Sequence, residues 1–89
     1  MSFYCRSDFI FQRKIDNTLC LLKNKDKYVY KLNETASFLW QMLEKETSSE
    51  DLSQALSKKY NIPLTQASAD VDNFLTYWLK EKLIKKVVQ

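Results

Sequence analysis

The spacing of apolar residues changes at Asn33, and this change constrains the fold more than any other feature of the sequence. Before Asn33 the apolar residues alternate with a period of about two, which is typical of β-strands. After Asn33 they recur with a period of about 3.6, which is typical of amphipathic helices. A chain of 89 residues has room for one core. The sequence therefore predicts a single α+β domain over residues 1–89.

The first two strands are predicted to form a hairpin. Residues 9–15 alternate so that one face holds three apolar side chains, Phe9, Phe11 and Ile15. The pair Asp16-Asn17 tolerates the positive φ angles of a two-residue turn, so we expect residues 18–22 to return antiparallel.

A second turn at residues 24–26 leads to a third strand over residues 27–32, which is rich in residues that favour strands. Tyr28, Tyr30 and Leu32 share one face of this strand, and Val29 and Lys31 share the other. A sheet of three strands cannot close, so at least one edge stays free to pair with an extended peptide.

Three helices are predicted after the strands. Asn33 can cap the first helix, whose inner stripe is Ala36, Leu39, Trp40 and Leu43. Thr47 and Glu50 form a capping box at the start of the second helix, which ends at Asn61.

Pro63 fits the first turn of the third helix, which is expected to run to about Lys82 and to be followed by a short strand over residues 84–88. Its packed stripe consists of Ala67, Val71, Phe74, Leu75 and Trp78. The chain contains no glycine, so the residues expected to carry left-handed backbone are Asn17, Asn24 and Asn61. The predicted fold is a three-stranded antiparallel sheet followed by three helices, with winged helix-turn-helix character.

Catalysis, metal binding and cofactor binding are not expected. The chain lacks histidine, the commonest general base and a usual zinc ligand, and it lacks the glycines of a phosphate-binding loop. Cys5 and Cys20 have no CxxC spacing, so we expect both thiols to be free and Cys20 to be buried. No apolar run is long enough to span a membrane, and residues 1–9 lack the apolar core of a secretory signal. The expected location is the cytoplasm.

Charge is distributed unevenly along the chain. Residues 1–32 carry seven Lys or Arg against three Asp, and residues 33–75 carry three Lys against seven acids. Residues 76–89 carry four Lys against one Glu. This layout is compatible with a charged binding face and equally with simple solubility.

A winged-helix DNA-binding regulator is one alternative function. The third helix is a poor groove reader, because it carries Asp70 and Asp72 with Asn73 as its one plausible base contact. Peptide binding uses the same fold in another way: a guest strand would pair with residues 27–31, beside the broad surfaces of Tyr28 and Tyr30. The two tyrosines fit a role in covering the core equally well.

Several segments resemble the PqqD-like family in order and spacing. They are Tyr28 to Ala36, Leu39 to Leu43, Thr47 to Leu52, Tyr60 to Pro63, Ala69 to Leu75, and Leu83-Ile84. The resemblance covers roughly residues 9–86. Two positions depart from the family pattern: Ile62 stands where an acidic helix cap is common, and Lys82 stands where glycine usually precedes the final Leu-Ile pair.

The resemblance implies a recognition element for ribosomally made, post-translationally modified peptides. Such proteins bind the leader segment of a precursor peptide as an antiparallel strand and present the core segment to a leader peptidase, a cyclase or a radical-SAM maturase. A chain of this length resembles the discrete versions of the pyrroloquinoline quinone and lasso-peptide pathways, the lasso type more closely. A subunit that only supports an enzyme is a third possibility, and it would bind the enzyme but no peptide.

The resemblance also implies which residues contact the guest. The predicted site lies between the third strand and the third helix, and it comprises Lys27, Tyr28, Val29, Tyr30, Lys31, Asp70, Val71, Phe74, Tyr77 and Trp78. Phe74 and Trp78 are expected to support the groove floor, whereas Asp70 and Tyr77 are expected to make direct contact.

Overall fold

The computed structural model describes residues 2–23 and 28–88 of the chain. Its strands are β1 (Ser2–Arg6), β2 (Ile10–Ile15), β3 (Thr18–Lys23), β4 (Tyr28–Leu32), β5 (Thr47–Ser48) and β6 (Ile84–Val88). Its helices are α1 (Glu34–Met42), α2 (Ser49–Tyr60) and α3 (Leu64–Lys80). The predicted α+β class, with three helices after a sheet, is confirmed.

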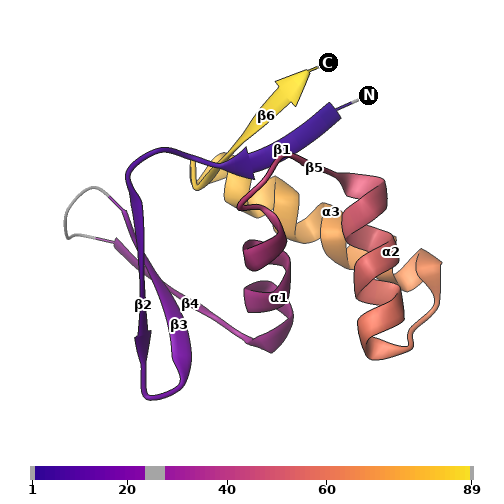
Figure 1. Cartoon of the computed structure of the whole chain (residues 1–89), viewed down its shortest axis with the longest axis horizontal. Helices are drawn as coiled ribbons and strands as arrows, with labels where there is room; N and C mark the ends of the chain where they lie inside the picture. The colour runs from indigo at the N-terminus through magenta and orange to yellow at the C-terminus, as the bar shows by residue number, and fades with distance from the viewer. Residues whose placement is uncertain (1, 24–27, 89) are drawn as a thin grey trace.

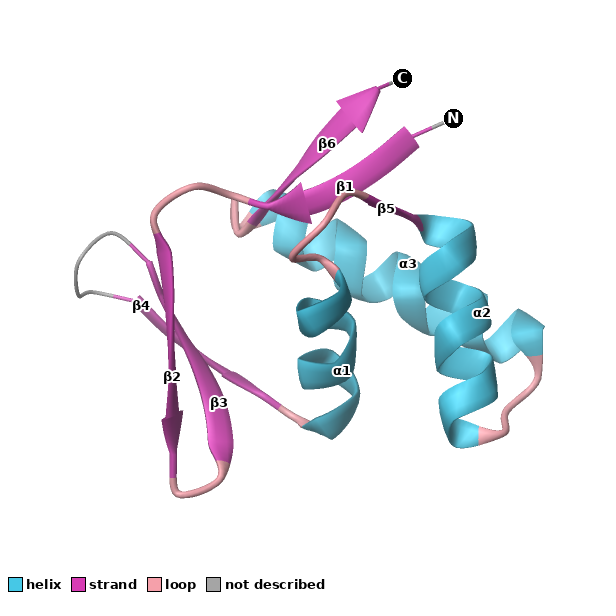
Figure 2. Ribbon diagram, viewed as in Figure 1, coloured by secondary structure: helices cyan, strands magenta, loops and turns pink. Residues whose placement is uncertain are grey.

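The strands form two antiparallel sheets, ordered β2-β3-β4 and β5-β1-β6. The β2-β3-β4 sheet stands to one side of the helices, and the second sheet lies above them beside both chain termini (Figures 1 and 2). The second sheet was not predicted. It joins the first and last strands of the described chain, Ser2–Arg6 and Ile84–Val88, which are remote in sequence.

The turn between β2 and β3 has the predicted geometry. Asp16 and Asn17 have φ angles of 50° and 66°, as a type I′ hairpin turn requires, and Ile15 pairs with Thr18. The turn predicted at residues 24–26, with its left-handed Asn24, lies outside the described residues.

The β2-β3-β4 sheet has one face toward the helices and one away from them. The inner face includes Leu19, Leu21 and Leu32, which are buried in the core cluster. Cross-strand pairing places a second set on the opposite, outer face: Phe11, Arg13, Ile15, Thr18, Cys20, Leu22, Val29 and Lys31. The predicted apolar face of β2 is therefore exposed, and Phe9 precedes the strand with a left-handed φ of 65°.

Of the three predicted helix starts, that of α1 is confirmed and the other two differ by one residue, since Pro63 precedes α3 as its N-cap and does not lie in its first turn. Asn33 caps α1 as predicted, because its Oδ1 accepts a hydrogen bond from the Ala36 N–H at 2.8 Å. The cap of α2 is Ser48 rather than Thr47, and its hydroxyl accepts from the Asp51 N–H at 3.1 Å. The Thr47 hydroxyl instead lies within hydrogen-bonding distance of the carbonyl of Met42, the last residue of α1, at 2.9 Å and of the carbonyl of Lys45 in the following loop at 2.8 Å.

A left-handed residue follows each of the two later helices. Asn61 terminates α2 with a φ of 54°, as predicted. The predicted end of α3 at Lys82 is too late, because the helix ends at Lys80 and Lys82 has a φ of 61°. The Leu83 N–H donates to the Trp78 carbonyl at 2.9 Å, which closes a Schellman motif with Lys82 at the position that glycine usually occupies.

Two tryptophans occupy the centre of the core. Trp40 and Trp78 are almost completely buried, and their rings meet edge to face with centroids 5.6 Å apart. The Trp40 indole N–H donates to the Gln12 side chain at 3.0 Å, which ties α1 to the sheet. Within residues 2–23 and 28–88, no helix has the length and apolar character to cross a membrane.

Arg6 joins β1 to the end of α1. Its Nε and Nη2 donate to the carbonyl of Trp40 at 3.1 and 2.8 Å, and its guanidinium lies 4.9 Å from the Trp40 ring centroid. Burial lowers the pKa of Arg6, and the nearby Glu44 carboxylate partly offsets this effect. Arg6 therefore satisfies a helix-terminal carbonyl with a charged donor.

Candidate functional site

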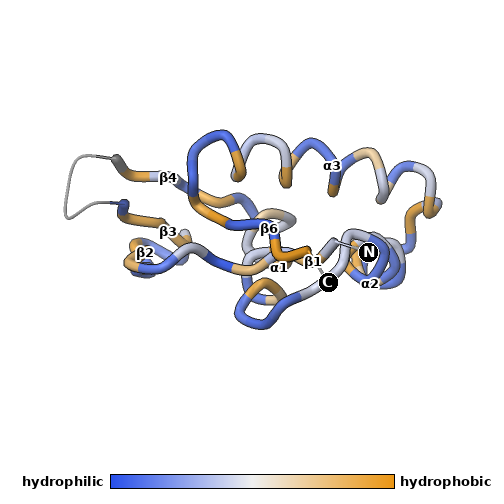
Figure 3. Tube along the Cα trace, turned by 90° about the horizontal axis from the view of Figure 1, so that it is seen from above, coloured by the Kyte–Doolittle hydropathy of each residue, from blue (hydrophilic) through white to orange (hydrophobic). Residues whose placement is uncertain are grey.

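A cavity of about 270 Å³ lies between β4 and α3. Nine residues from β4, the start of α1 and the second half of α3 line it: Val29, Tyr30, Lys31, Leu32, Asn33, Ala36, Phe74, Tyr77 and Trp78. Seen from above, β4 is the strand of its sheet on the side where α3 lies (Figure 3). We call this cavity and the adjoining edge of β4 the β4 groove.

The edge of β4 beside this groove is unpaired in the described part of the chain, because β4 pairs only with β3. The hairpin turn shows which backbone groups point outward. In a type I′ hairpin the residues flanking the turn, Ile15 and Thr18, form a hydrogen-bonded pair, and the side to which backbone groups point then alternates along each strand.

This alternation directs the backbone groups of Leu21 toward β4. Its partner Tyr30 faces β3 in turn. The N–H and C=O groups of Val29 and Lys31 consequently point to the free edge. These are the groups that an added strand would bind.

Aromatic side chains form the floor and rim of the β4 groove. Trp78 is only 2% exposed and forms the floor together with the half-buried Phe74, whose ring centroid lies 5.4 Å from that of Trp78. Tyr77 is 50% exposed at the rim. Ala36 is buried at the start of α1, where its small side chain leaves space between the strand and α3. The floor is therefore apolar and the rim amphipathic.

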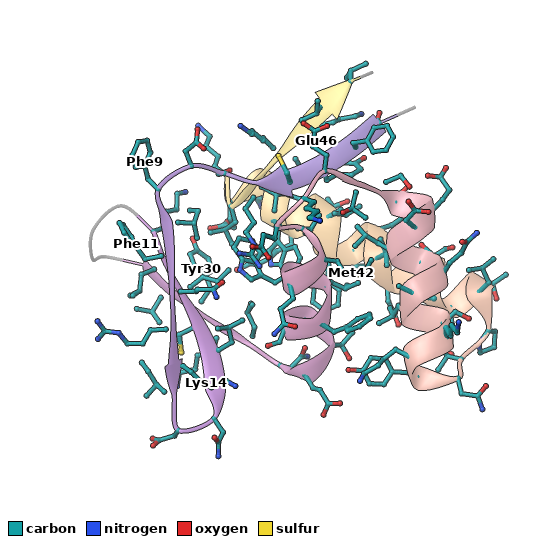
Figure 4. All side chains as sticks on the ribbon, in the orientation of Figure 1. Phe9, Phe11, Lys14, Tyr30, Met42 and Glu46 are labelled. Atoms are coloured by element: carbon teal, nitrogen blue, oxygen red, sulfur yellow. The ribbon has the colours of Figure 1, made fainter. Side chains whose placement is uncertain are left out.

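Tyr30 and Lys23 hold the sheet against the end of α3. The Tyr30 hydroxyl donates to Glu81 Oε1 at 2.8 Å, and the Lys23 ammonium donates to the Glu81 carbonyl at 2.6 Å. Figure 4 shows the Tyr30 side chain between the sheet and the helices. These two hydrogen bonds fix the distance between the two walls of the groove.

The structure brings six of the ten predicted site residues together in the lining of the β4 groove. They are Val29, Tyr30, Lys31, Phe74, Tyr77 and Trp78. Asp70 is half-buried and lies outside the lining, and Val71 is fully buried in the core cluster. Lys27 lies outside the described residues, and the backbone of Tyr28 pairs with Lys23.

Sequence reasoning missed Leu32, Asn33 and Ala36, which also line the groove. A signal was present, because β4 runs directly into α1 through a single linking residue, Asn33. Side chains in the first turn of that helix must lie close to the strand. Glu81 was missed as well, and sequence spacing gives no indication of its bond to Tyr30.

The β4 groove offers an aromatic floor and the outward backbone groups of Val29 and Lys31. In the described part of the chain, no three His, Cys, Asp or Glu side chains form a group that could hold a metal ion. Cys5 and Cys20 are both free, and Cys20 is buried as predicted. Asp72 is exposed on α3, where its carboxylate would repel the phosphates of duplex DNA.

A family model described as "Coenzyme PQQ synthesis protein D (PqqD)" matches residues 19–84. No curated protein and no solved structure matches the chain. The matched segment contains β3 except its first residue, β4, all three helices and the start of β6, and so includes every residue that lines the β4 groove. The chain therefore belongs to the PqqD family, whose members are non-catalytic proteins that bind the precursor peptides of ribosomally made, modified products.

Proposed function

We propose that this protein binds the leader segment of a precursor peptide as an antiparallel strand on β4, and that it acts in the cytoplasm in lasso-peptide biosynthesis. The bound precursor is presented to a partner enzyme: a leader peptidase, a cyclase or a radical-SAM maturase. The assignment to a lasso pathway rests on the sequence resemblance around residues 28–32 and not on the groove.

One observation carries the proposal: the free edge of β4 lies directly beside a groove with an aromatic floor. The outward backbone groups of Val29 and Lys31 would supply main-chain hydrogen bonds without regard to guest sequence. Side-chain specificity would come from the groove, because every second residue of a guest strand points toward the same face.

The two faces of the guest meet different surroundings. Residues that point inward would lie against Phe74 and Ala36, so apolar side chains fit there. Residues that point outward would lie beside Val29 and the exposed Lys31, so an acidic side chain fits there. The preferred leader is therefore amphipathic, with apolar residues alternating with polar or acidic ones.

The proposed mechanism is tethering. Binding the leader raises the effective concentration of the core segment near the partner enzyme to the order of millimolar for a short flexible linker. No bond is made or broken by this protein itself.

A fluorescence titration tests the proposal. The probe is a synthetic peptide with the N-terminal half of a candidate precursor, chosen from short reading frames near this gene, and the control is the same peptide with its order scrambled. Because Trp78 forms the groove floor, its emission should change on saturation with the leader and stay constant with the scrambled peptide. The proposal fails if neither peptide binds to protein that is folded by circular dichroism.

Strand direction is tested with a nitroxide label on the leader. An antiparallel guest places its N-terminal end near Leu32 and its C-terminal end near Tyr28. A label at the N-terminus should broaden the amide signals of Leu32 and Asn33, and a label at the C-terminus should broaden that of Tyr28. The reverse pattern would show a parallel guest.

A further inference from the structure

Exposed apolar side chains gather on the outer face of the β2-β3-β4 sheet. Phe11 is 56% exposed, Ile15 48% and Val29 53%, and Phe9 just before β2 is 83% exposed. Figure 4 shows Phe9 and Phe11 on the side away from the helices. These are four of the seven large exposed hydrophobic residues in the described part of the chain. Such clustering is typical of a surface that another molecule covers.

The charges on this face are of one sign. Arg13 and Lys31 are both exposed there, in one row of side chains across the sheet because both pair with Cys20. The described strand residues of the outer face include no acid. Asp8 and Asp16 lie beyond the ends of β2. The face is therefore apolar with cations among the apolar groups.

The positive charges indicate what kind of molecule covers the outer face. Two copies of the chain packed through this face would bring Arg13 and Lys31 close to their counterparts, and like charges in contact oppose association. A partner surface that is apolar and carries carboxylates would match both features. A second copy of this protein is thus disfavoured.

The outer face is continuous with the β4 groove, because Val29 and Lys31 belong to both. If a leader strand pairs with β4, every second side chain of that leader extends the outer face by one more strand. A partner that covers the face would then contact the sheet and the captured leader together. The contact between the partner and the captured leader rests on the proposed function, whereas the apolar and cationic character of the outer face does not.

We propose that the outer face is the docking surface for the enzyme that acts on the captured precursor. Its contact surface is apolar and bears carboxylates that pair with Arg13 and Lys31. The bound leader strand forms part of the surface that the enzyme recognises, so the enzyme binds the loaded protein more tightly than the empty one.

Titration with a purified candidate partner enzyme (a leader peptidase, a cyclase or a radical-SAM maturase) tests this proposal, with and without the leader peptide. Phe11→Ser should weaken enzyme binding roughly tenfold, and Arg13→Glu should weaken it several-fold. The matched control is Leu64→Ser, which alters a half-exposed apolar residue at the start of α3, far along the chain from the sheet. All three variants should bind the leader with unchanged affinity.

Three outcomes would overturn the docking surface. One is equal enzyme affinity for Phe11→Ser and Leu64→Ser. Another is failure of the wild-type protein to bind the enzyme. The third is a homodimer in sedimentation experiments that Phe11→Ser dissociates, because a second copy would then cover the face. If the leader fails to bind but Phe11→Ser still weakens enzyme binding, the proposed function fails and the docking surface stands.

Discussion

The Tyr30 hydroxyl and the Glu81 carboxylate form a 2.8 Å hydrogen bond that joins β4 to the residue following α3. This bond connects the strand that supplies the free edge to the helix that supplies the groove floor. It also holds Tyr30 as a wall of the cavity. The groove is thus preformed, which lowers the entropic cost of binding a guest.

Tyr30→Phe should lower the free energy of unfolding by about 1 kcal/mol, because it removes a partly buried hydrogen bond to a charged acceptor. It should also weaken leader binding, since the groove walls are less well fixed. Urea unfolding and the fluorescence titration measure the two effects. Tyr60→Phe is the control, because its bond to Glu34 is exposed and longer, at 3.2 Å. Equal losses of stability and of leader affinity in Tyr30→Phe and Tyr60→Phe would contradict the role of the Tyr30 hydroxyl in fixing the groove walls.

Val29→Pro should abolish leader binding while the protein stays folded. The substitution removes an N–H that points to the free edge, so the β3-β4 pairing keeps its own hydrogen bonds. Val29→Ala keeps the N–H and should bind the leader with only a modest loss. Tyr30→Pro removes an N–H that faces β3, so it should lower the melting temperature. Unchanged leader affinity in a folded Val29→Pro variant would exclude strand addition at this edge.

Lys82→Gly should raise the free energy of unfolding by about 0.5–1 kcal/mol. Lys82 has a φ of 61° in the Schellman motif after α3, where a side chain is disfavoured and glycine is not. Lys82→Ala is the matched variant, because it removes the charge but retains Cβ. Thermal unfolding should show a higher melting temperature for Lys82→Gly but not for Lys82→Ala. A similar increase in both variants would show that loss of the charge is the cause.

Arg6→Ala should lower the free energy of unfolding by about 1–3 kcal/mol, because the Trp40 carbonyl loses a charged donor. Arg6→Lys should recover only part of this loss, since a lysine cannot reproduce two donors in a fixed fork. Lys85→Ala changes an exposed cation on the strand beside β1 and serves as the control. Urea unfolding gives all three values, and equal stability of the Arg6→Ala and Lys85→Ala variants would rule out the proposed contact as a stabilising one.

The spacing of apolar residues predicted those strands and helices whose formation depends on neighbouring residues in the sequence. The alternation in residues 28–32 and the stripe of Trp40 and its neighbours located β4 and α1, and Asn17 and Asn61 have the expected left-handed backbone. Helix boundaries were less well determined. Thr47 and Ser48 can both act as a cap, and only the contact of Thr47 with the loop after α1 decides between them.

Non-local pairing accounts for what the sequence did not reveal. β1 is a strand because it pairs with β6, which lies at the other end of the chain. The period of β2 shows that Phe11 and Ile15 share a face, but it does not show which face packs on the helices. The bond of Glu81 to Tyr30 likewise depends on how α3 packs on the remaining chain.

Amide hydrogen exchange with and without the leader peptide tests strand addition to β4 most directly. The amides of Val29 and Lys31 point to the free edge of β4, and by the same alternation those of Gln12 and Lys14 point to the opposite edge of the sheet, on β2. We expect saturating leader to slow exchange at Val29 and Lys31 by at least about tenfold and to leave Gln12 and Lys14 unchanged. Protection at Gln12 and Lys14, or unchanged exchange at Val29 and Lys31 in leader-saturated protein, would contradict the account.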